Sequence, residues 1–339
     1  MKKILVLLFA MLALSPLAAV DFLNLPGNFH LSITPILALT NGQIGEYVYT
    51  KVTDTTDKKI SELQWDEKNI ISLGGAIRGG YKDIFVDISF ARGFSPVKSD
   101  TMEDSDWMNS SDPTMKTTFS INENTLISYT TFNTKAGYTF RPLSWLYLSP
   151  HAEFEYIYRF YSANNGYGWY GQQYNVPWYD PKARYYKPGE LCGIDYSRMI
   201  MSSYIGGTVQ FNLPFHFSIL LSAAISPASY QESYDTHFTT TTKTSSKNYL
   251  DIASNADDST RAFFWGVTKF SATICYTINR YFDVSFSYLA RYSGLQKGVT
   301  ATQNSQNVYV IDKQSRSGFD TFESIFKLSC TFHLKRYPQ

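Results

Sequence analysis

The stretch 282–292 reads FDVSFSYLARY, and apolar side chains at its even positions alternate with mostly polar ones at its odd positions. Successive side chains of a β-strand point to opposite faces, so this period of two predicts a strand with one apolar face. Residues 84–90 and 322–334 alternate in the same way, and the second stretch exceeds the usual strand length of about five to six residues. Strands of roughly nine or more residues with one apolar and one polar face are typical of outer-membrane β-barrels.

The composition favours strands and excludes several other classes of protein. Aromatic residues make up 17% of the 339-residue chain, which is too many for a disordered protein and is typical of β-structure. The 30 Lys and Arg nearly balance the 29 Asp and Glu, so no strongly basic surface for nucleic acid is predicted. After residue 19, no apolar run approaches the roughly 18 to 20 residues of a membrane-spanning helix. The sequence therefore predicts an all-β protein with no nucleic-acid partner.

The first 19 residues have the three parts of a secretory signal peptide. Residues 2–3 are lysines, residues 4–14 are apolar, and residues 15–19 form a break followed by small residues. The apolar run is too short for a transmembrane anchor. We expect cleavage after this segment, which leaves a single exported domain over residues 20–339.

Short turns and long polar segments alternate along the rest of the chain. The predicted turns are residues 79–82, 141–144, 212–214 and 279–280, and the predicted loops are residues 50–62, 97–124, 164–190, 236–257 and 299–315. Four turns and five loops join ten antiparallel strands and leave both chain ends on the short-turn side. The sequence thus predicts a ten-stranded transmembrane β-barrel in the bacterial outer membrane, with its long loops on the extracellular side. A soluble β-sandwich is disfavoured, because it would not need strands of this length.

Two short acidic patterns lie where the predicted loops meet. In Asp104-Ser105-Asp106, residues i and i+2 of an extended chain project to one side, so two carboxylates are close enough to share a proton or position a water. In Asp235-Thr236-His237, the same spacing puts a carboxylate beside an imidazole and leaves one ring nitrogen free as a general base. Solvated loop side chains are the alternative interpretation of both patterns.

The direction in which Asp235 points depends on whether its strand alternates regularly. Strict alternation from Phe217 would turn Asp235 outward. An inward Asp235 therefore requires a β-bulge near Pro227, or a position above the membrane where both faces are wet.

Other kinds of catalytic motif are missing from the sequence. No His and Cys set has zinc-binding spacing, and there is no Gly-x-Ser-x-Gly motif and no phosphate-binding loop. The sequence therefore predicts no metal and no cofactor.

Residues 104–113, DSDWMNSSDP, resemble the DxDWMxSS block, followed by Pro, of the omptin family of outer-membrane endopeptidases. Residues 235–237 resemble the Asp-x-His pair of that family at the same place in the strand order, and residues 46–49 and 61–65 are similar to its first loop. The resemblance implies a ten-stranded barrel with an aspartic-type endopeptidase activity that uses neither metal nor covalent intermediate.

The resemblance also implies a role for each residue of the site. His237 would be the base that deprotonates a water, and Asp235 would orient it. Asp104 and Asp106 would hold that water and support the tetrahedral intermediate.

Substrate preference follows from the same resemblance. Omptins cleave beside basic residues, which acidic side chains bind, and Glu46 matches one of these acids. The second acid falls at Ser233 and a third near Thr118, neither of which is acidic, and Glu232 is a candidate to compensate. We therefore expect cleavage after Arg or Lys in peptides or proteins at the cell surface, with Glu46 and Ser233 in the substrate-binding site.

Lipopolysaccharide is a further partner that the resemblance implies. Omptins require this lipid as an activator and bind it through outward basic side chains of the barrel wall. Arg159 lies in the corresponding strand.

A non-enzymatic barrel, either a porin or an adhesin on an omptin-like scaffold, is the alternative function. A porin does not need four residues such as Asp104, Asp106, Asp235 and His237 within reach of a single water, so that set distinguishes the two functions. A lipid-modifying hydrolase is disfavoured, because no Ser-His pair is predicted at a membrane-facing position.

Overall fold

The computed structural model describes residues 28–52, 57–254 and 266–335. The predicted signal segment, residues 1–19, lies outside these ranges and stays a prediction. Within the described ranges, no helix is long and apolar enough to cross a membrane.

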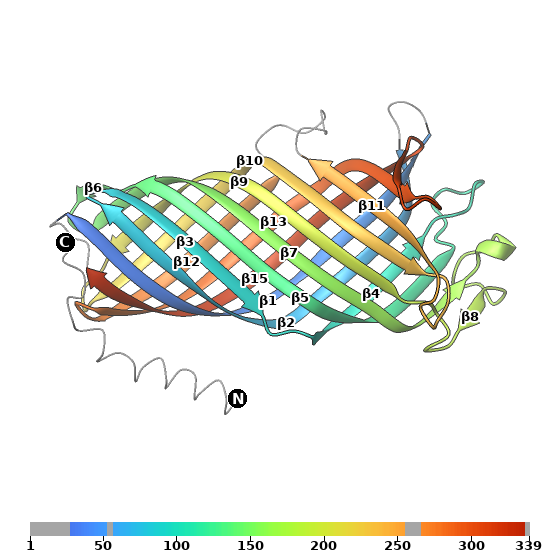
Figure 1. The fold of residues 1–339 in the computed structure, drawn as a ribbon, viewed down its shortest axis with the longest axis horizontal. Helices are drawn as coiled ribbons and strands as arrows, with labels where there is room; N and C mark the ends of the chain where they lie inside the picture. The colour runs from blue at the N-terminus through green and yellow to red at the C-terminus, as the bar shows by residue number, and fades with distance from the viewer. Residues whose placement is uncertain (1–27, 53–56, 255–265, 336–339) are drawn as a thin grey trace.

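The described residues form one large antiparallel sheet (Figure 1). Its strands are β1 (Phe29–Lys51), β2 (Asp57–Tyr81), β3 (Ile84–Gly93), β4 (Val97–Asp106), β5 (Thr118–Tyr138), β6 (Phe140–Leu143), β7 (Leu146–Tyr170), β8 (Arg184–Tyr186), β9 (Ile194–Asn212), β10 (Phe217–Phe238), β11 (Ser246–Ser254), β12 (Val267–Asn279), β13 (Phe282–Gln303), β14 (Tyr309–Asp312) and β15 (Ser315–Lys335). A short 3-10 helix, η2 (Gln172–Tyr174), follows β7.

The sheet closes into a ring because β1 pairs with β2 on one side and with β15 on the other. β3 and β4 follow one path and share the neighbours β2 and β5, and β11 and β12 likewise share β10 and β13. The ring therefore has ten strand positions, in the order β1, β2, β3/β4, β5, β7, β9, β10, β11/β12, β13 and β15. The prediction of a ten-stranded antiparallel barrel is confirmed.

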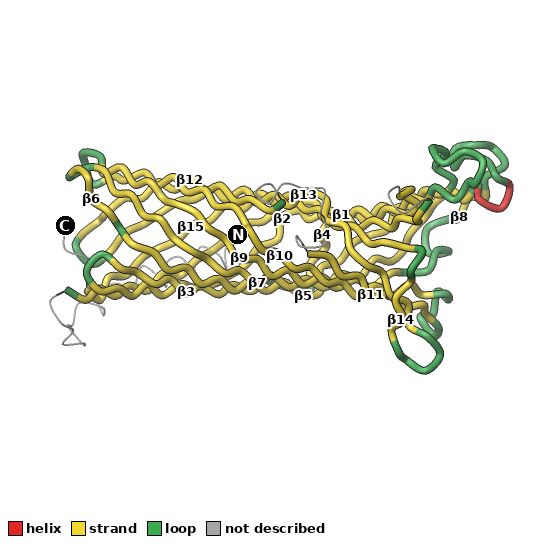
Figure 2. The backbone as a smooth tube through the Cα atoms, turned by 90° about the horizontal axis from the view of Figure 1, so that it is seen from above, coloured by secondary structure: helices red, strands yellow, loops and turns green. Residues whose placement is uncertain are grey.

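The strands are much longer than a membrane requires. β2 and β7 have 25 residues each and β10 has 22, whereas a tilted strand crosses the hydrocarbon core with about 9 to 11 residues. Figure 2 shows the remaining length as a strand wall that continues to the end where β8, β14 and the long loops lie. The barrel therefore extends well beyond the membrane on the side of the long loops.

The outer surface near the short turns is apolar. Its exposed large apolar side chains include Ile33, Ile77, Ile84, Val86, Ile88, Phe90, Phe140, Leu148, Ile205, Phe217, Leu221, Phe270, Ile274 and Phe286. A barrel in lipid turns an apolar band of about 25 Å outward. This surface places the membrane around the half of the barrel that carries the short turns.

Strands extend into all five predicted loops, including the two next to the acidic patterns. β4 continues to Asp106 and β5 begins at Thr118, so strand replaces most of the predicted loop 97–124. β10 continues to Phe238 and β11 begins at Ser246, within the predicted loop 236–257. Above the membrane the outer face contacts water and the inner face carries buried polar side chains as well as apolar ones. The strands there lack the apolar alternation by which strands are recognised in a sequence.

The expected bulge is present in β10. The register of β10 against β9 shifts between Ile225 and Ala228, on either side of Pro227. Even-numbered residues such as Ala224 are buried before the shift, and odd-numbered residues such as Ser233 and Asp235 are buried after it. The bulge thus turns Asp235 toward the inside of the barrel.

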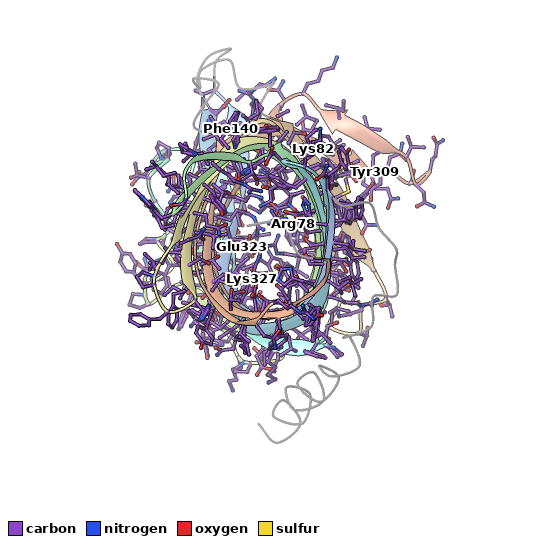
Figure 3. The ribbon with its side chains drawn as sticks, turned by 90° about the vertical axis from the view of Figure 1, so that its left-hand side faces the viewer. Arg78, Lys82, Phe140, Tyr309, Glu323 and Lys327 are labelled. Carbon is purple, nitrogen blue, oxygen red and sulfur yellow. The ribbon has the colours of Figure 1, made fainter. Side chains whose placement is uncertain are left out.

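Buried ion pairs cross the middle of the barrel. Glu323 pairs with both Arg159 and Arg291, Arg159 also pairs with Glu67 at 3.0 Å, and Arg291 also pairs with Glu155 at 2.7 Å. Figure 3, which looks into the short-turn end, shows Glu323 inside the ring of strands. Arg159 is fully buried, so the expectation that it is an outward, lipid-facing basic residue is wrong. Arg159 points inward because two buried carboxylates compensate its charge there. No such carboxylates would be available on the outer face.

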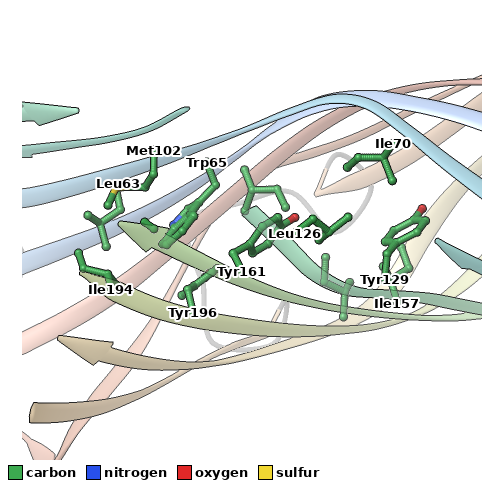
Figure 4. Close-up of a cluster of buried hydrophobic side chains, with 13 residues drawn as sticks. Leu63, Trp65, Ile70, Met102, Leu126, Tyr129, Ile157, Tyr161, Ile194 and Tyr196 are labelled. Atoms are coloured by element: carbon green, nitrogen blue, oxygen red, sulfur yellow. The ribbon is translucent and has the colours of Figure 1, made fainter. Parts of the chain in front are cut away.

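A cluster of buried hydrophobic side chains fills part of the barrel interior (Figure 4). The ring of Trp65 stacks on the rings of Tyr161 and Tyr196, with centroid distances of 5.4 and 4.9 Å. A cavity of about 1360 Å³ lies at the short-turn end, and its lining includes Glu155 and Arg291 but none of these three aromatic residues. Ion pairs and aromatic side chains therefore separate this cavity from the loop end of the barrel.

The ion pairs predict a large stability difference between two carboxylate variants. Glu323→Gln leaves buried arginines with less compensating charge, so we expect the free energy of unfolding to fall by about 3 to 5 kcal/mol. Glu123→Gln is the control, because the Lys98–Glu123 pair is exposed and its removal should leave the unfolding midpoint unchanged. Urea unfolding of the refolded proteins in detergent measures both, and equal midpoints for the two variants would contradict this account.

Candidate functional site

The two acidic patterns lie on opposite walls at the loop end of the barrel. Asp104 and Asp106 are at the end of β4, and Asp235 and His237 are near the end of β10. Around the ring, β5, β7 and β9 separate β4 from β10 on one side, and β2, β1, β15, β13 and β11 separate them on the other. All four residues belong to strands and not to loops, so the barrel wall fixes their backbone.

The residues that follow Asp106 hold the end of β4 in place. The backbone N–H of Trp107 donates to the carbonyl of Ile60 at 2.9 Å, which extends the pairing with β2 by one residue. The ammonium groups of Lys59 and Lys116 lie 4.2 and 5.3 Å from the centroid of the Trp107 ring. These contacts give the Trp of the DSDWMNSS stretch a structural role in positioning both carboxylates.

Asn109 shapes the turn after this strand. Its side-chain carbonyl accepts hydrogen bonds from the backbone N–H groups of Ser111 and Asp112, at 2.7 and 2.9 Å. Such an Asx turn reverses the chain without a glycine. The chain therefore turns back toward β5 directly beside Asp106.

Asp235 and His237 form a hydrogen-bonded pair. Nε2 of His237 lies 2.5 Å from Oδ2 of Asp235, and the ring of Tyr249 meets the imidazole edge to face at 5.5 Å. The side chain of Asp235 is 6% exposed, whereas that of His237 is 37% exposed. The carboxylate of Asp235 is thus buried inside the barrel, whereas the imidazole of His237 reaches the solvent at the mouth.

The two patterns influence each other electrostatically. Burial alone would lower the pKa of His237, but Asp235, followed by Asp104 and Asp106, raises it to about 9. Burial and the neighbouring Asp106 raise the pKa of Asp104 well above its usual value, and His237 opposes this shift. The four groups therefore interact electrostatically across the mouth of the barrel.

The two predicted substrate-binding residues lie inside the barrel beside Asp235. Glu46 on β1 is 2% exposed and Ser233 on β10 is 0% exposed. Burial and then the charges of Asp235 and Asp251 raise the pKa of Glu46 well above its usual value. Glu46 and Ser233 thus lie within an acidic region of the interior.

The two other positions considered for substrate binding lie elsewhere. Glu232 lies on the outer face of β10 and accepts a hydrogen bond from the hydroxyl of Tyr230 at 2.6 Å. It therefore does not compensate for the missing acid at position 233. Thr118 is buried on β5 opposite Asp106, so it adjoins the carboxylate pair.

Asp251 is an acidic residue of this region that the sequence analysis missed. It lies on β11 directly opposite Ser233 and is 2% exposed. The segment 249–253 fell within the predicted loop 236–257, although its alternation of side chains is that of a short strand. Recognition of β11 as a strand would have turned Asp251 toward the same side as Ser233.

No metal centre is found among the residues that the structure describes. No group of three or more His, Cys, Asp or Glu side chains there is arranged to hold a metal ion. The expectation that the site works without a metal stays a prediction.

The fold is similar to that of a solved outer membrane protease. The outer membrane protease OmpT from Escherichia coli is 16% identical, and the match has a TM-score of 0.77 over 93% of this chain and 100% of that chain. The translocator domain of the autotransporter NalP from Neisseria meningitidis is 7% identical, with a TM-score of 0.35 over 94% of this chain and 91% of that chain. No curated protein matches the sequence.

The family comparison covers most of the chain. The model of the omptin family matches residues 27–313, a range that includes both acidic patterns, Glu46, Ser233 and Asp251. The chain therefore belongs to the omptin family.

Proposed function

We propose that the protein is an outer-membrane endopeptidase whose catalytic site faces the extracellular medium. The observation that carries this proposal is the hydrogen-bonded Asp235–His237 pair, electrostatically coupled to Asp104 and Asp106 on the opposite wall. Membership of the omptin family supports it, as does a fold similar to that of the outer membrane protease OmpT.

In the proposed mechanism, the nucleophile is a water held between the two pairs. Nε2 of His237 bonds Asp235, so Nδ1 is the ring nitrogen that takes the proton as the water oxygen attacks the peptide carbonyl carbon. Asp104 and Asp106 orient the water and, when one of them carries a proton, stabilise the oxyanion that forms. The C–N bond then breaks, and the imidazolium returns its proton to the leaving amine.

The closed interior argues against the porin alternative. The ion pairs around Glu323 and the stack on Trp65 lie between the cavity at the short turns and the loop end. A porin needs a continuous aqueous channel, which these side chains interrupt. An adhesin remains the alternative for a protein without activity.

The catalytic proposal predicts the effect of removing either pair. His237→Ala and Asp104→Asn should each lower kcat/KM by roughly 10² to 10⁴-fold, because a general base or a positioned water is lost. The double variant should be scarcely worse than either single variant, since the residues act as a unit. Refolded protein assayed on a basic fluorogenic peptide, with and without lipopolysaccharide and EDTA, measures these effects, and we expect activation by the lipid and no effect of the chelator.

Glu103→Gln and His216→Ala are the matched controls for these variants. Glu103 directly precedes Asp104 on β4 and has its side chain on the other face, and His216 lies in a short turn at the opposite end of the barrel. Both should keep wild-type activity. Undiminished cleavage by His237→Ala would remove the mechanism, and a wild type that cleaves no substrate would favour the adhesin.

The pKa of His237 predicts an alkaline pH profile. The base acts in its neutral form, and its pKa of about 9 exceeds the ordinary value of 6.5. Activity should therefore be low at neutral pH and rise with pH until about 9. The dependence of kcat/KM on pH between 6 and 10 measures this limb, and a plateau that begins near pH 7 would contradict it.

The proposed orientation predicts which tags antibodies reach. Epitope tags inserted between β4 and β5 or between β10 and β11 should stain on intact cells, whereas a tag in the short turn between β2 and β3 should stain only after permeabilisation. Flow cytometry measures the staining. The reverse pattern would show that the site faces the periplasm.

A further inference from the structure

A cavity of about 1360 Å³ lies inside the barrel at the short-turn end, away from the proposed catalytic site. It is larger than the roughly 300 to 1,000 Å³ of most small-molecule sites. Among the residues that the structure describes, seven Lys and Arg side chains line it but only five Asp and Glu side chains. The cavity therefore carries an excess of positive charge, although the chain as a whole is close to neutral.

Each of these five acidic side chains already binds a basic one. The pairs are Arg78–Asp87, Arg141–Asp83, Lys269–Glu153, Arg291–Glu155 and His333–Asp283. Within the described ranges, no carboxylate forms an ion pair with Lys135 or Lys327. Arg280 also has no ion pair there, but it lies in an exposed turn, over the ring of Tyr281. The two lysines are therefore the interior cations that the wall leaves uncompensated.

Lys327 has the less compensated ammonium of the two. It lies on β15, and its neighbours in register, Ala38 on β1 and Ser287 on β13, carry no charge. The strongest charge influences on it come from three cations and one carboxylate, namely Arg291, Lys269, Lys135 and Glu155. Both oxygens of that carboxylate already accept hydrogen bonds from the guanidinium of Arg291, at 2.7 and 3.1 Å. Figure 3 shows Lys327 inside the ring of strands.

Lys135 approaches from another wall of the cavity. It lies on β5, which β1, β2 and β3 separate from β15 around the ring, yet its charge acts on Lys327. Its neighbours in register are Asp87 and Glu153, and each of these carboxylates binds a second cation. The ammonium groups of Lys135 and Lys327 therefore repel each other through the open cavity, and an anion between them would remove that repulsion.

We propose that the cavity binds a phosphate group between the ammonium groups of Lys135 and Lys327. A phosphate group carries roughly −1.5 to −2 charges at neutral pH and several strong acceptor oxygens. One phosphate therefore compensates both lysines, whereas a carboxylate compensates only one. Lysine binds phosphate as a point charge, and its flexible stem lets ammonium groups from two walls reach the same anion.

A neutral donor of the wall completes the proposed site. Ser287 lies beside Lys327 in register and lines the cavity. Its hydroxyl oxygen accepts a hydrogen bond from the hydroxyl of Thr273 at 2.8 Å, which leaves its own proton to donate to an anion. Inorganic phosphate and a small phosphate monoester share this chemistry, and the cavity has room for either.

Titration calorimetry on refolded protein in detergent at pH 7 and constant ionic strength tests the inference. The probes are inorganic phosphate and glycerol phosphate. Wild type should bind at least one of them saturably, and Lys327→Gln or Lys135→Gln should raise the Kd by at least about tenfold, as expected when a charge-assisted hydrogen bond is lost. Tighter binding of inorganic phosphate would assign the site to the free ion, and tighter binding of glycerol phosphate would assign it to a monoester.

Two further variants separate loss of the site from damage to the fold. Lys327→Arg keeps the positive charge, so its Kd should stay within about threefold of wild type. Lys82→Gln is the matched control, because Lys82 is an exposed lysine in the short turn between β2 and β3, outside the cavity lining. It should leave the Kd unchanged.

Stability provides a second readout. Without phosphate, Lys327→Gln should unfold at a urea concentration no lower than wild type, because it removes an uncompensated cation. Phosphate should raise the unfolding midpoint of wild type but not that of the variant.

Three results would overturn the inference. They are a wild type that binds neither probe, a Lys327→Gln variant that binds as tightly as wild type, and a lower midpoint of that variant without phosphate, which would show that Lys327 serves to compensate the wall. Proteolysis enters none of these measurements, so the proposed function is tested separately.

Discussion

Closure of the sheet between β1 and β15 is the constraint on which the rest of the structure depends. A strand in lipid has no water to bond its backbone, so every strand needs a neighbour on both sides and the ring must be complete. The same closure gives each strand one outer and one inner face. The strands are much longer than the thickness of the membrane, so the inner face continues beyond the lipid. Charged side chains from opposite walls face one another there.

The inner face changes in character along the barrel. Near the short turns it surrounds a cavity of about 1360 Å³, in the middle it is crossed by the ion pairs of Glu323, and above these it is packed around Trp65. At the mouth, the carboxyl groups of Glu46, Asp235 and Asp251 lie close enough to influence one another. The lower layers support the wall that carries the acidic side chains of the mouth.

The sequence predicted the fold wherever one face met lipid and the other did not. Apolar alternation, as in residues 282–292, revealed the strands, and the parity of β10 led to the bulge beside Pro227. Above the membrane that contrast is lost, so the strand ends near Asp106 and the whole of β11 were assigned to loops. Arg159 was expected on the outer face and Asp251 was not recognised as part of the site. In both cases only the pairing register of the strands shows to which face a polar side chain points. The roles of the four site residues and the need for lipopolysaccharide remain predictions.

The central claim is that the Asp235–His237 pair and the two aspartates of β4 are electrostatically coupled, so that the protonation of one group changes the pKa of the others. The most direct test is an NMR titration of His237 in refolded protein with isotopically labelled histidine, in wild type and in Asp104→Asn. The account predicts a pKa of about 9 in wild type and a lower value in the variant, because Asp104 is one of the charges that raise it. A pKa near 6.5 in wild type, or the same value in both proteins, would contradict the coupling across the barrel.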